Sequence, residues 1–548
     1  MTPVFELADR YVSELAALDP IGAAARGVDG QDHQLTDYSP AGIAARSDLA
    51  RRTARDLRTT PQETDRDRVA ADLMLERISS ELAMEEAGER GRDLRIIGSP
   101  VQGIRQVFDL MPRSTPSDWE VVASRMVKVP AALDGFIRTL RAASEQGNVA
   151  PRRQALACAD QAEAWSGPSP FFLEYVAGAP EALQPSIDEV ATAATAAYAR
   201  LARYLRDEYA PMASEVDGVG ADRYRIAAQS WLGMAIDPIE TYYWGWEDLH
   251  RIDREMAAVA DEIVPRGTVE EAKALLESDP GRAIEGEDNL VRWIQNLMDS
   301  TIEELDGRHF DIAEPIKTVQ AMIAPPGGAA AMYYTPPNED FSRPGRTWYP
   351  TQGQTRFPLW GEVSIAYHEG VPGHHLQLAQ VKYLSEQLSR YQRMAGVGGH
   401  AEGWALYAER LMDELGYLDN PDYRLGQLRA QALRAVRVII DIGMHLGLQI
   451  PAGQDFHPGQ TWTPDLGYEF AAARSHFPAE FMQSEVVRYL GWPAQAICYK
   501  VGERVWLQAR DEVRRRQRNQ FHLKAFHATA LDLGPLGLDQ LQAELARI

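Results

Sequence analysis

The chain has 548 residues, a net charge of −23 and two cysteines, and these values exclude several classes of protein. Because 79 Asp and Glu residues outnumber 56 Lys and Arg residues, the surface repels phosphate backbones and anionic lipids. We therefore expect neither a nucleic-acid partner nor a membrane partner. Cys158 and Cys498 are too few for a disulfide framework or a cysteine-rich zinc module. Any bound zinc must use histidine and carboxylate ligands.

The N-terminal segment and the apolar stretches predict where the protein resides. Glu6, Asp9 and Arg10 interrupt the region in which a secretory signal would carry an apolar run. No stretch approaches the roughly 18 uncharged apolar residues that a membrane span requires. We therefore expect a cytoplasmic protein, whereas the oligomeric state does not follow from the sequence.

Amphipathic helices dominate the predicted elements in the first part of the chain. Apolar residues recur there at spacings of three and four, for instance in DRVAADLMLERISSELAMEE, and Pro and Gly clusters such as IIGSPVQG separate the helices. This pattern predicts an N-terminal helical region over residues 1–235. Further helices are expected beyond it, among them YYWGWEDLHRIDREMAAVADEIV.

The helical period is lost between residues 314 and 350, where Pro, Gly, aromatic and β-branched residues are mixed. This composition predicts short strands and ordered loops. Helix is expected again over 361–415, 422–449 and the C-terminal third. We therefore predict a mainly α fold with a small β and loop segment before the metal-binding helix. Residues 236–548 would form the catalytic region, in one continuous structural unit with a central cleft.

Four of the 12 histidines lie within residues 368–400, where an even distribution would place fewer than one. They are His368, His374, His375 and His400. Such clustering is what a histidine-based zinc site needs. In the pattern HExxH, two histidines one helical turn apart hold zinc, and the intervening Glu takes a proton from the bound water. Here Glu369 follows His368 in the segment AYHEGVPGHHLQ.

This segment departs from HExxH, because the residue four after His368 is Pro372, which cannot bind a metal and interrupts a helix. A bulge at Pro372 and Gly373 would bring His374 into the place of the second ligand. His375 would lie two turns away, roughly 10.5 Å along an unbroken helix, which is too far to share an ion with His368. We therefore predict His368 and His374 as ligands and Glu369 as the general base.

A third zinc ligand is predicted on the next helix, in GHAEGWALYAERLMDELG. Glu402 lies there on a face with Leu406 and Glu409, beside an apolar stripe. We expect Glu402 to be half-buried, to face the preceding helix and to bind the metal. His400 either orients a ligand or caps the helix.

Cationic and aromatic residues further along the chain are candidates for substrate binding. The otherwise apolar helix of residues 422–449 carries a row of Arg434, Arg437, Asp441 and His445, which either pairs internally or lines a wet cavity. In the segment RYLGWPAQAICYK, Tyr489 and Tyr499 are candidate oxyanion donors, and Arg488 and Lys500 are candidate carboxylate binders. Alternatively, the tyrosines are core aromatics, and Glu485 or Glu503 neutralises the cations.

The motifs YHEGVPGHHLQ, EGWALYAERLMDELG, SRPGRTWY, RAVRVIIDIGMH and EVVRYLGWPAQAICYKVGE resemble those of DUF885, a bacterial family of unknown function that is grouped with zincin-like metallopeptidases. The resemblance covers nearly the whole chain and implies a predominantly helical, gluzincin-like fold. In the family pattern Tyr can replace the second histidine of the HH pair, which favours His374 over His375. This chain has PAQA at 493–496 where the family usually has PGQA, and the family has no settled substrate.

The resulting hypothesis is a zinc-dependent hydrolase of peptide bonds that acts as a carboxypeptidase or oligopeptidase on short peptides. Its Zn²⁺ would be held by His368, His374 and Glu402, Glu369 would transfer the proton, and Tyr489 or Tyr499 would stabilise the oxyanion. Arg434, Arg437, Arg488 and Lys500 would hold a substrate carboxylate. One alternative is hydrolysis of a non-peptide amide, for example in a secondary metabolite. Another is a non-catalytic helical protein with a structural metal, closed by a fourth ligand such as His375.

Overall fold

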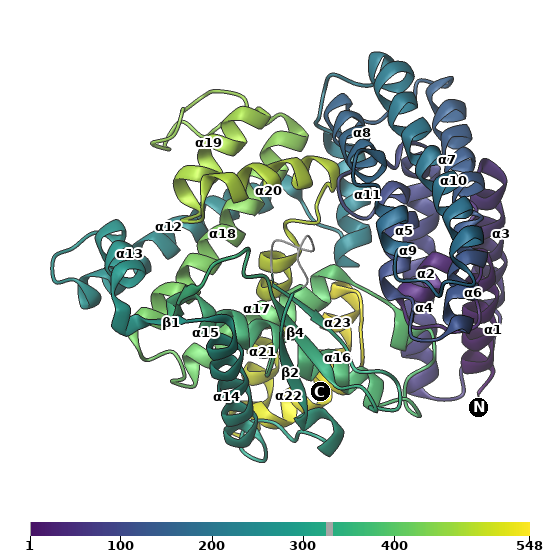
Figure 1. The fold of residues 1–548 in the computed structure, drawn as a ribbon. Coiled ribbons are helices and arrows are strands. Elements are labelled where there is room, and N and C mark those ends of the chain that lie inside the picture. Colours follow the sequence, from purple (N-terminus) through teal and green to yellow (C-terminus); the bar gives the residue numbers. More distant parts are fainter. Residues whose placement is uncertain (1, 325–331, 548) are drawn as a thin grey trace. The chain divides into compact units, whose positions relative to one another are not determined.

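The computed structural model describes residues 2–324 and 332–547, which form a mainly α protein with small sheets (Figure 1). The chain divides into two compact units. The first contains residues 1–226 and 484–493, and the second contains residues 227–483 and 494–548. The sequence analysis placed a boundary at residue 235 and assigned residues 484–493 to the later region. The structure places this short segment with the N-terminal helices instead.

The first unit is built from helices with clear start signals. Proline occupies the first turn of several of them, and Thr64 and Thr115 form capping boxes with Asp67 and Asp118. Phe108, Phe136 and Tyr198 are buried in a shared apolar core, and α10 packs against α7, α8 and α9. The helices of this unit are α1 (Pro3–Leu18), α2 (Pro20–Ala25), α3 (Pro40–Leu57), α4 (Asp65–Glu86), α5 (Pro100–Gln106), α6 (Pro116–Met126), α7 (Val129–Ser144), α8 (Arg152–Ser166), α9 (Phe171–Val176) and α10 (Gln184–Arg203).

The second unit contains most of the remaining helices. They are α12 (Pro238–Ile263), α13 (Val269–Ser278), α14 (Glu287–Leu305), α15 (Glu362–Glu369), α16 (His374–Tyr383), α17 (Gly398–Glu414), α18 (Pro421–Leu446), α19 (Pro464–Arg474), α21 (Cys498–Gln517), α22 (Leu523–Asp532) and α23 (Leu538–Leu545). Helices α11 (Gly220–Leu232) and α20 (Ala479–Gly491) each contain residues of both units. Among the described residues, no helix is both long and apolar enough to cross a membrane.

The predicted strand segment forms a small sheet with the order β2-β4-β3. Strand β2 (Val319–Ile323) is parallel to β4 (Gly345–Tyr349), and β3 (Tyr333–Thr335) is antiparallel to β4, with Tyr334 opposite Thr347. Residues 325–331 of this segment lie outside the described residues. Helix α14 packs against β2 and α16 against β4 (Figure 1). Strands β1 (Ala283–Glu285) and β5 (Arg356–Pro358) form a separate antiparallel pair.

Two helix pairs form the centre of the second unit. Helix α18 is buried from Leu425 to Met444 almost without interruption, and it packs along α12. Helix α17 packs on α21 through two glycines. A Cβ atom on Gly403 would lie 2.5 Å from the Cα atom of Gly502, so a side chain at this crossing would push the helices apart. This contact positions α17 next to α15 and α16.

Candidate metal centre

The HEGVPGHH segment forms two helices joined by a turn, which lies where the sequence predicts a bulge. The backbone N–H of Gly373 donates to the carbonyl of Tyr367, six residues back, at 3.0 Å, so the turn contains two residues more than a turn of α-helix. Helix α15 ends at Glu369, and α16 begins at His374. The turn between them admits no side chain at Gly373, because a Cβ atom there would lie 2.0 Å from the carbonyl oxygen of His368. The indole nitrogen of Trp404 donates to the carbonyls of Pro372 at 2.9 Å and of Gly373 at 3.2 Å. These contacts return the chain so that His374 lies beside His368.

The three predicted ligands come together in this arrangement. One potential ligand atom from each of His368, His374 and Glu402 lies within 4.8 Å of the other two. The Nε2 atoms of both histidines are 3.5 Å from Oε2 of Glu402, and their rings meet edge to face at 4.9 Å between centroids. His368 is buried, and the other two residues are half-buried. Among the described residues, this is a cluster with the composition and size of a metal site.

The atoms of this cluster fit a cation. Oε2 of Glu402 is shielded from solvent and has no hydrogen-bond donor among residues 2–324 and 332–547. Burial alone would raise the pKa of Glu402, but His368 and His374 lower it well below its usual range, so the carboxylate is charged. A buried carboxylate oxygen without a donor is costly, and a bound cation removes that cost. Two imidazole nitrogens and one carboxylate oxygen are a donor set that suits zinc.

Glu409 orients His368 from the side opposite Glu402. Its Oε1 lies 2.8 Å from Nδ1 of His368 and 3.5 Å from the guanidinium of Arg434, and its Oε2 accepts from the Ser364 hydroxyl at 2.6 Å. Burial opposes protonation of His368, but the carboxylates of Glu402 and Glu409 outweigh it and raise the pKa of His368 to about 9. A carboxylate on the distal nitrogen of a histidine ligand fixes its ring and strengthens its basicity.

The sequence alone assigns no role to Glu409. The available signal was its position seven residues after Glu402, two turns along the same face of one helix. A carboxylate at that spacing next to a ligand helix is a candidate partner for a ligand histidine. The contacts of Glu409 with Ser364 and His368 could not be predicted, because they depend on the packing of α15 against α17.

Glu369 is the last residue of α15 and follows His368 directly. Its side chain is buried, and it is not one of the three residues of the potential ligand group. Its carboxylate contributes to the raised pKa of Tyr349, whose main cause is burial, so Tyr349 at the end of β4 lies in its neighbourhood. The position next to a ligand, without membership of the ligand group, is the one expected of a general base.

His375 and His400 lie outside the ligand group. Nε2 of His375 donates to the carbonyl of Ile316 at 2.6 Å, and Nδ1 accepts from the Tyr334 hydroxyl at 2.9 Å. Burial lowers the pKa of His375 to about 4 and that of His400 to about 3, so both rings are neutral at pH 7. Nδ1 of His400 lies 3.2 Å from the amide nitrogen of Gln377. Both histidines therefore serve contacts between elements.

The predicted substrate-binding residues separate into three groups. Arg434 and Arg437 lie over the ring of Tyr499, with their guanidinium carbons 5.8 Å and 4.8 Å from its centroid. This group adjoins the ligand cluster, because Glu409 contacts both Arg434 and His368. Arg434 thus links Arg437 and Tyr499 to the cluster.

Lys500 occupies a closed network of buried charges. Its ammonium lies 2.9 Å from the carboxylate of Asp248 and 2.6 Å from that of Glu503, and it donates to Gln431 at 2.6 Å. Although burial favours the neutral acid, Lys500 and Arg251 lower the pKa of Asp248 to about 2. These contacts support the internal ion pair considered as the alternative for Lys500, with Glu503 as its partner.

Arg488 and Tyr489 belong to the first unit, and both contact one carboxylate. The guanidinium of Arg488 donates to Glu485 at 2.8 Å and 2.9 Å, and the Tyr489 hydroxyl donates to the same residue at 2.7 Å. Tyr489 is fully buried. This is the arrangement in which Glu485 neutralises the arginine and the tyrosine is a core aromatic.

Fold and site together define a mainly α protein with a partly buried cluster of two histidines and one glutamate. The chain belongs to the family described as "Bacterial protein of unknown function (DUF885)", which matches residues 20–545. No curated protein matches the chain.

Two solved structures share the fold. One is described as "the putative lipoprotein from Colwellia psychrerythraea", with a TM-score of 0.85 and 21% identity over 100% of this chain and 99% of the other. The second is described as "a putative lipoprotein of unknown function from Shewanella oneidensis", with a TM-score of 0.77 and 17% identity over 100% of both chains. At these identities the similarity establishes the fold alone.

Proposed function

We propose that the protein is a zinc-dependent hydrolase of the gluzincin type that cleaves peptide bonds in short peptides. The observation that carries this proposal is the cluster of His368, His374 and Glu402, whose ligand atoms lie within 4.8 Å of one another. The donor-free oxygen of Glu402 and the carboxylate of Glu409 behind His368 support it.

The residues around the cluster have distinct tasks in this proposal. His368, His374 and Glu402 would hold zinc, which when bound lowers the pKa of a water molecule and polarises a carbonyl group. Glu369 accepts the proton of the attacking water on its carboxylate and passes it to the nitrogen of the leaving amine. Glu409 keeps the Nδ1 proton of His368 in place, so that Nε2 presents its lone pair.

A catalytic site is favoured over a structural one by the contacts of His375. A structural zinc site is closed by four protein ligands, whereas a catalytic site keeps one position open. The fourth ligand considered from the sequence was His375, and both of its ring nitrogens are engaged by Tyr334 and Ile316. Three ligands among the described residues therefore favour an open position.

Two features favour a peptide substrate with a free carboxylate. Strand β3 lies at an edge of the sheet whose central strand β4 precedes α15, and an extended peptide can pair with such an edge. Arg434 and Arg437 lie together beside the cluster, where guanidinium groups can bind a carboxylate in a bidentate manner. We therefore propose carboxypeptidase-like or oligopeptidase-like activity.

Metal content and hydrolysis, measured in parallel, test this proposal. The purified wild-type chain should contain about one zinc ion and cleave short peptides. Glu402→Gln should lose both properties. Glu414→Gln is the matched control, because Glu414 lies on the same helix but pairs with Arg510 at 2.7 Å. It should keep zinc and activity.

Each other outcome has a defined meaning. Full zinc content in Glu402→Gln would contradict the ligand assignment. A zinc-loaded chain that hydrolyses non-peptide amides but no peptides would replace the substrate class and keep the metal centre. A zinc-loaded chain that hydrolyses neither would favour a structural metal.

A further inference from the structure

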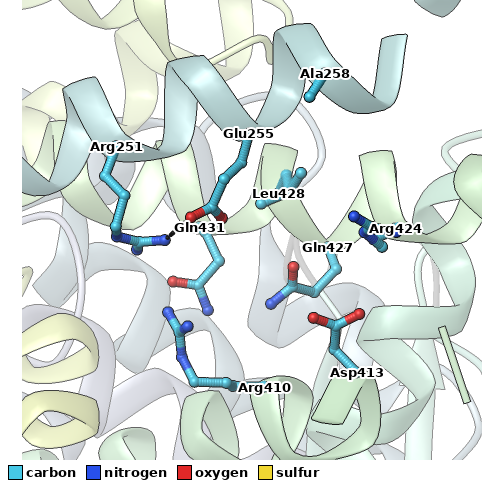
Figure 2. A pocket seen from close by; sticks show the side chains of 9 residues that line it. All are labelled: Arg251, Glu255, Ala258, Arg410, Asp413, Arg424, Gln427, Leu428 and Gln431. Carbon is cyan, nitrogen blue, oxygen red and sulfur yellow. Dashed lines mark hydrogen bonds and ion pairs between the residues drawn. The ribbon is translucent and has the colours of Figure 1, made fainter. Parts of the chain in front are cut away.

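A polar cavity lies within the second unit, between α12, α17 and α18. Its volume is about 310 Å³, near the lower end of the range for ligand pockets, which suits a small molecule. Figure 2 shows the side chains that line it. They are Arg251, Glu255, Ala258, Arg410, Asp413, Arg424, Gln427, Leu428 and Gln431. Three cations, two carboxylates and two amides therefore surround one small space.

The charges at one side of this cavity are balanced by the protein itself. Arg251 donates to Asp248 at 2.7 Å and to Glu255 at 2.7 Å. Arg410 donates to Glu503 at 2.8 Å. Arg251, Arg410 and Glu255 therefore form ion pairs within the protein, and their charges do not require a ligand.

Two opposite charges at the other side have no such partners. Within the described part of the chain, the side chains of Arg424 and Asp413 form neither an ion pair nor a hydrogen bond, with each other or with other residues. Burial raises the pKa of Asp413, and Arg424 and Arg410 only partly oppose this effect. One cation and one anion thus line the same cavity without direct contacts.

Gln427 provides an independent observation. Its side chain is 4% exposed, and its amide makes no hydrogen bond with residues 2–324 or 332–547. Figure 2 shows it pointing from α18 into the middle of the lining residues. Its amide nitrogen and oxygen are not shielded from a water-sized probe, so they face the space of the cavity. A ligand that offers both an acceptor and a donor can replace the water at these two atoms.

The cavity is separate from the candidate metal centre, although both include residues of α17. Glu402, Glu409 and Asp413 lie along one face of α17 at spacings of seven and four. At 1.5 Å per residue, Asp413 lies roughly 16 Å beyond Glu402 along the helix axis. A small molecule cannot reach both ends of this row at once.

We propose that this cavity binds a small zwitterion, a free α-amino acid or a dipeptide. Arg424 would hold the carboxylate, Asp413 would hold the ammonium group, and Gln427 would hydrogen-bond to the polar atoms between them. Leu428 and Ala258 supply the apolar part of the wall, which suits an aliphatic side chain. A simple anion would be repelled by Asp413, and a simple cation by Arg424. The site does not depend on the proposed hydrolase activity.

The test uses calorimetric titration of the full-length chain with L-leucine and two analogues. N-acetyl-L-leucine lacks the ammonium charge, and L-leucinamide lacks the carboxylate. We expect L-leucine to bind at least tenfold more tightly than either analogue. The affinity of Arg424→Gln for L-leucine should equal the affinity of the wild type for L-leucinamide. The affinity of Asp413→Asn for L-leucine should equal that of the wild type for N-acetyl-L-leucine. Matched controls are Arg254→Gln on α12 and Asp288→Asn on α14, both at exposed positions, which should bind as the wild type does.

Three outcomes would overturn this proposal. They are no saturable binding of L-leucine, equal binding of all three compounds, and unchanged affinity in both cavity variants. Because the analogue series uses the wild-type chain, a variant that fails to fold does not remove the test. Ala258→Trp, at an exposed position of the wall, should also weaken binding by obstructing the cavity.

One further variant separates this proposal from the proposed metal centre. His374→Ala should leave L-leucine binding unchanged. Loss of binding in His374→Ala, with retention in Arg424→Gln, would place the amino acid at the metal cluster and contradict the cavity site. Absence of zinc from the wild-type chain would contradict the proposed zinc-dependent hydrolase activity, whereas the expected binding of L-leucine would be unchanged.

Discussion

Two buried clusters of charge in the second unit differ in how completely the protein satisfies them. Around Lys500, the ammonium has carboxylates at 2.6 Å and 2.9 Å and an amide at 2.6 Å. Around His368, Glu409 is fully contacted, but Glu402 keeps a shielded oxygen without a donor among the described residues. Oδ2 of Asp248 in the first cluster also makes no hydrogen bond of regular geometry, but the Lys500 ammonium lies 2.9 Å from it. The nearest partners of the Glu402 oxygen are two imidazole nitrogens at 3.5 Å.

This difference separates a structural network from a candidate site. Burial of charge is common to both clusters, so burial alone does not identify function. What distinguishes the His368 cluster is the shielded oxygen of Glu402, which faces two imidazoles and which a small cation would fit. We therefore expect variants of the Lys500 cluster to lose stability, and variants of the His368 cluster to lose bound metal and activity.

The largest effect is expected for Glu369, the proposed proton-transfer residue of the candidate metal centre. Glu369→Gln should lower kcat/KM for a short peptide by about 10²- to 10⁴-fold, because general acid–base catalysis contributes on that scale. Its zinc content should match the wild type. Glu362→Gln, at the other end of α15, is the control, because burial raises the pKa of Glu362 to about 7 and the amide resembles the neutral acid. An active Glu369→Gln variant would remove the general-base role.

Lys500→Met should break the closed cluster. Removing one partner of a buried ion pair leaves uncompensated charge, so the free energy of unfolding should fall by about 3–5 kcal/mol in urea titrations. The folded fraction should retain its zinc. Lys524→Met is the control, because Lys524 pairs with exposed Asp311, and such pairs contribute at most about 1 kcal/mol. Equal losses in the two variants would contradict the distinction between the clusters.

Glu409→Gln tests the link between the ligand cluster and the residues behind it. The amide retains the shape but loses the charge that orients His368, so zinc affinity should fall by about 10- to 100-fold. Competition with a chromogenic chelator measures this change. Unaltered affinity would show that His368 is positioned by packing alone.

The smallest effect concerns the substrate carboxylate. A short peptide with a free C-terminus should have a kcat/KM about tenfold higher than its C-terminal amide, since a charge-assisted hydrogen bond contributes about 1.5–3 kcal/mol. Arg437→Gln should reduce this preference, whereas Arg488→Gln, whose guanidinium is held by Glu485, should preserve it. Equal rates for acid and amide, or cleavage far from the C-terminus, would contradict a carboxypeptidase-like activity.

The elements that depend on local sequence were predictable. Apolar periodicity predicted a mainly α fold, which is confirmed, and the loss of that period marked the small sheet. The histidine spacing pointed to His374, which the structure places beside His368 and Glu402; whether they bind zinc stays a prediction. The two helices of the HEGVPGHH segment were not predicted, because the turn depends on the indole of Trp404 from α17.

The partners of the buried charges depend on tertiary packing and could not be predicted from the sequence. Lys500 and Arg434 are both cations next to apolar residues in the sequence, and only the packed structure surrounds Lys500 with Asp248 and Glu503. Glu409 and Ser364 are far apart in the chain and meet because α15 packs on α17. The assignment of residues 484–493 to the first unit likewise depends on contacts with distant helices.

The placement of the three proposed ligands on α15, α16 and α17 has a mechanical consequence. In one continuous helix, the pitch fixes the spacing of two histidines, but here the spacing depends on how separate helices are held together. A bound zinc ion would link all three helices, and its binding free energy would add to the free energy of unfolding of the second unit. Removal of the ion would then lower the stability of the second unit as well as abolish the proposed hydrolysis.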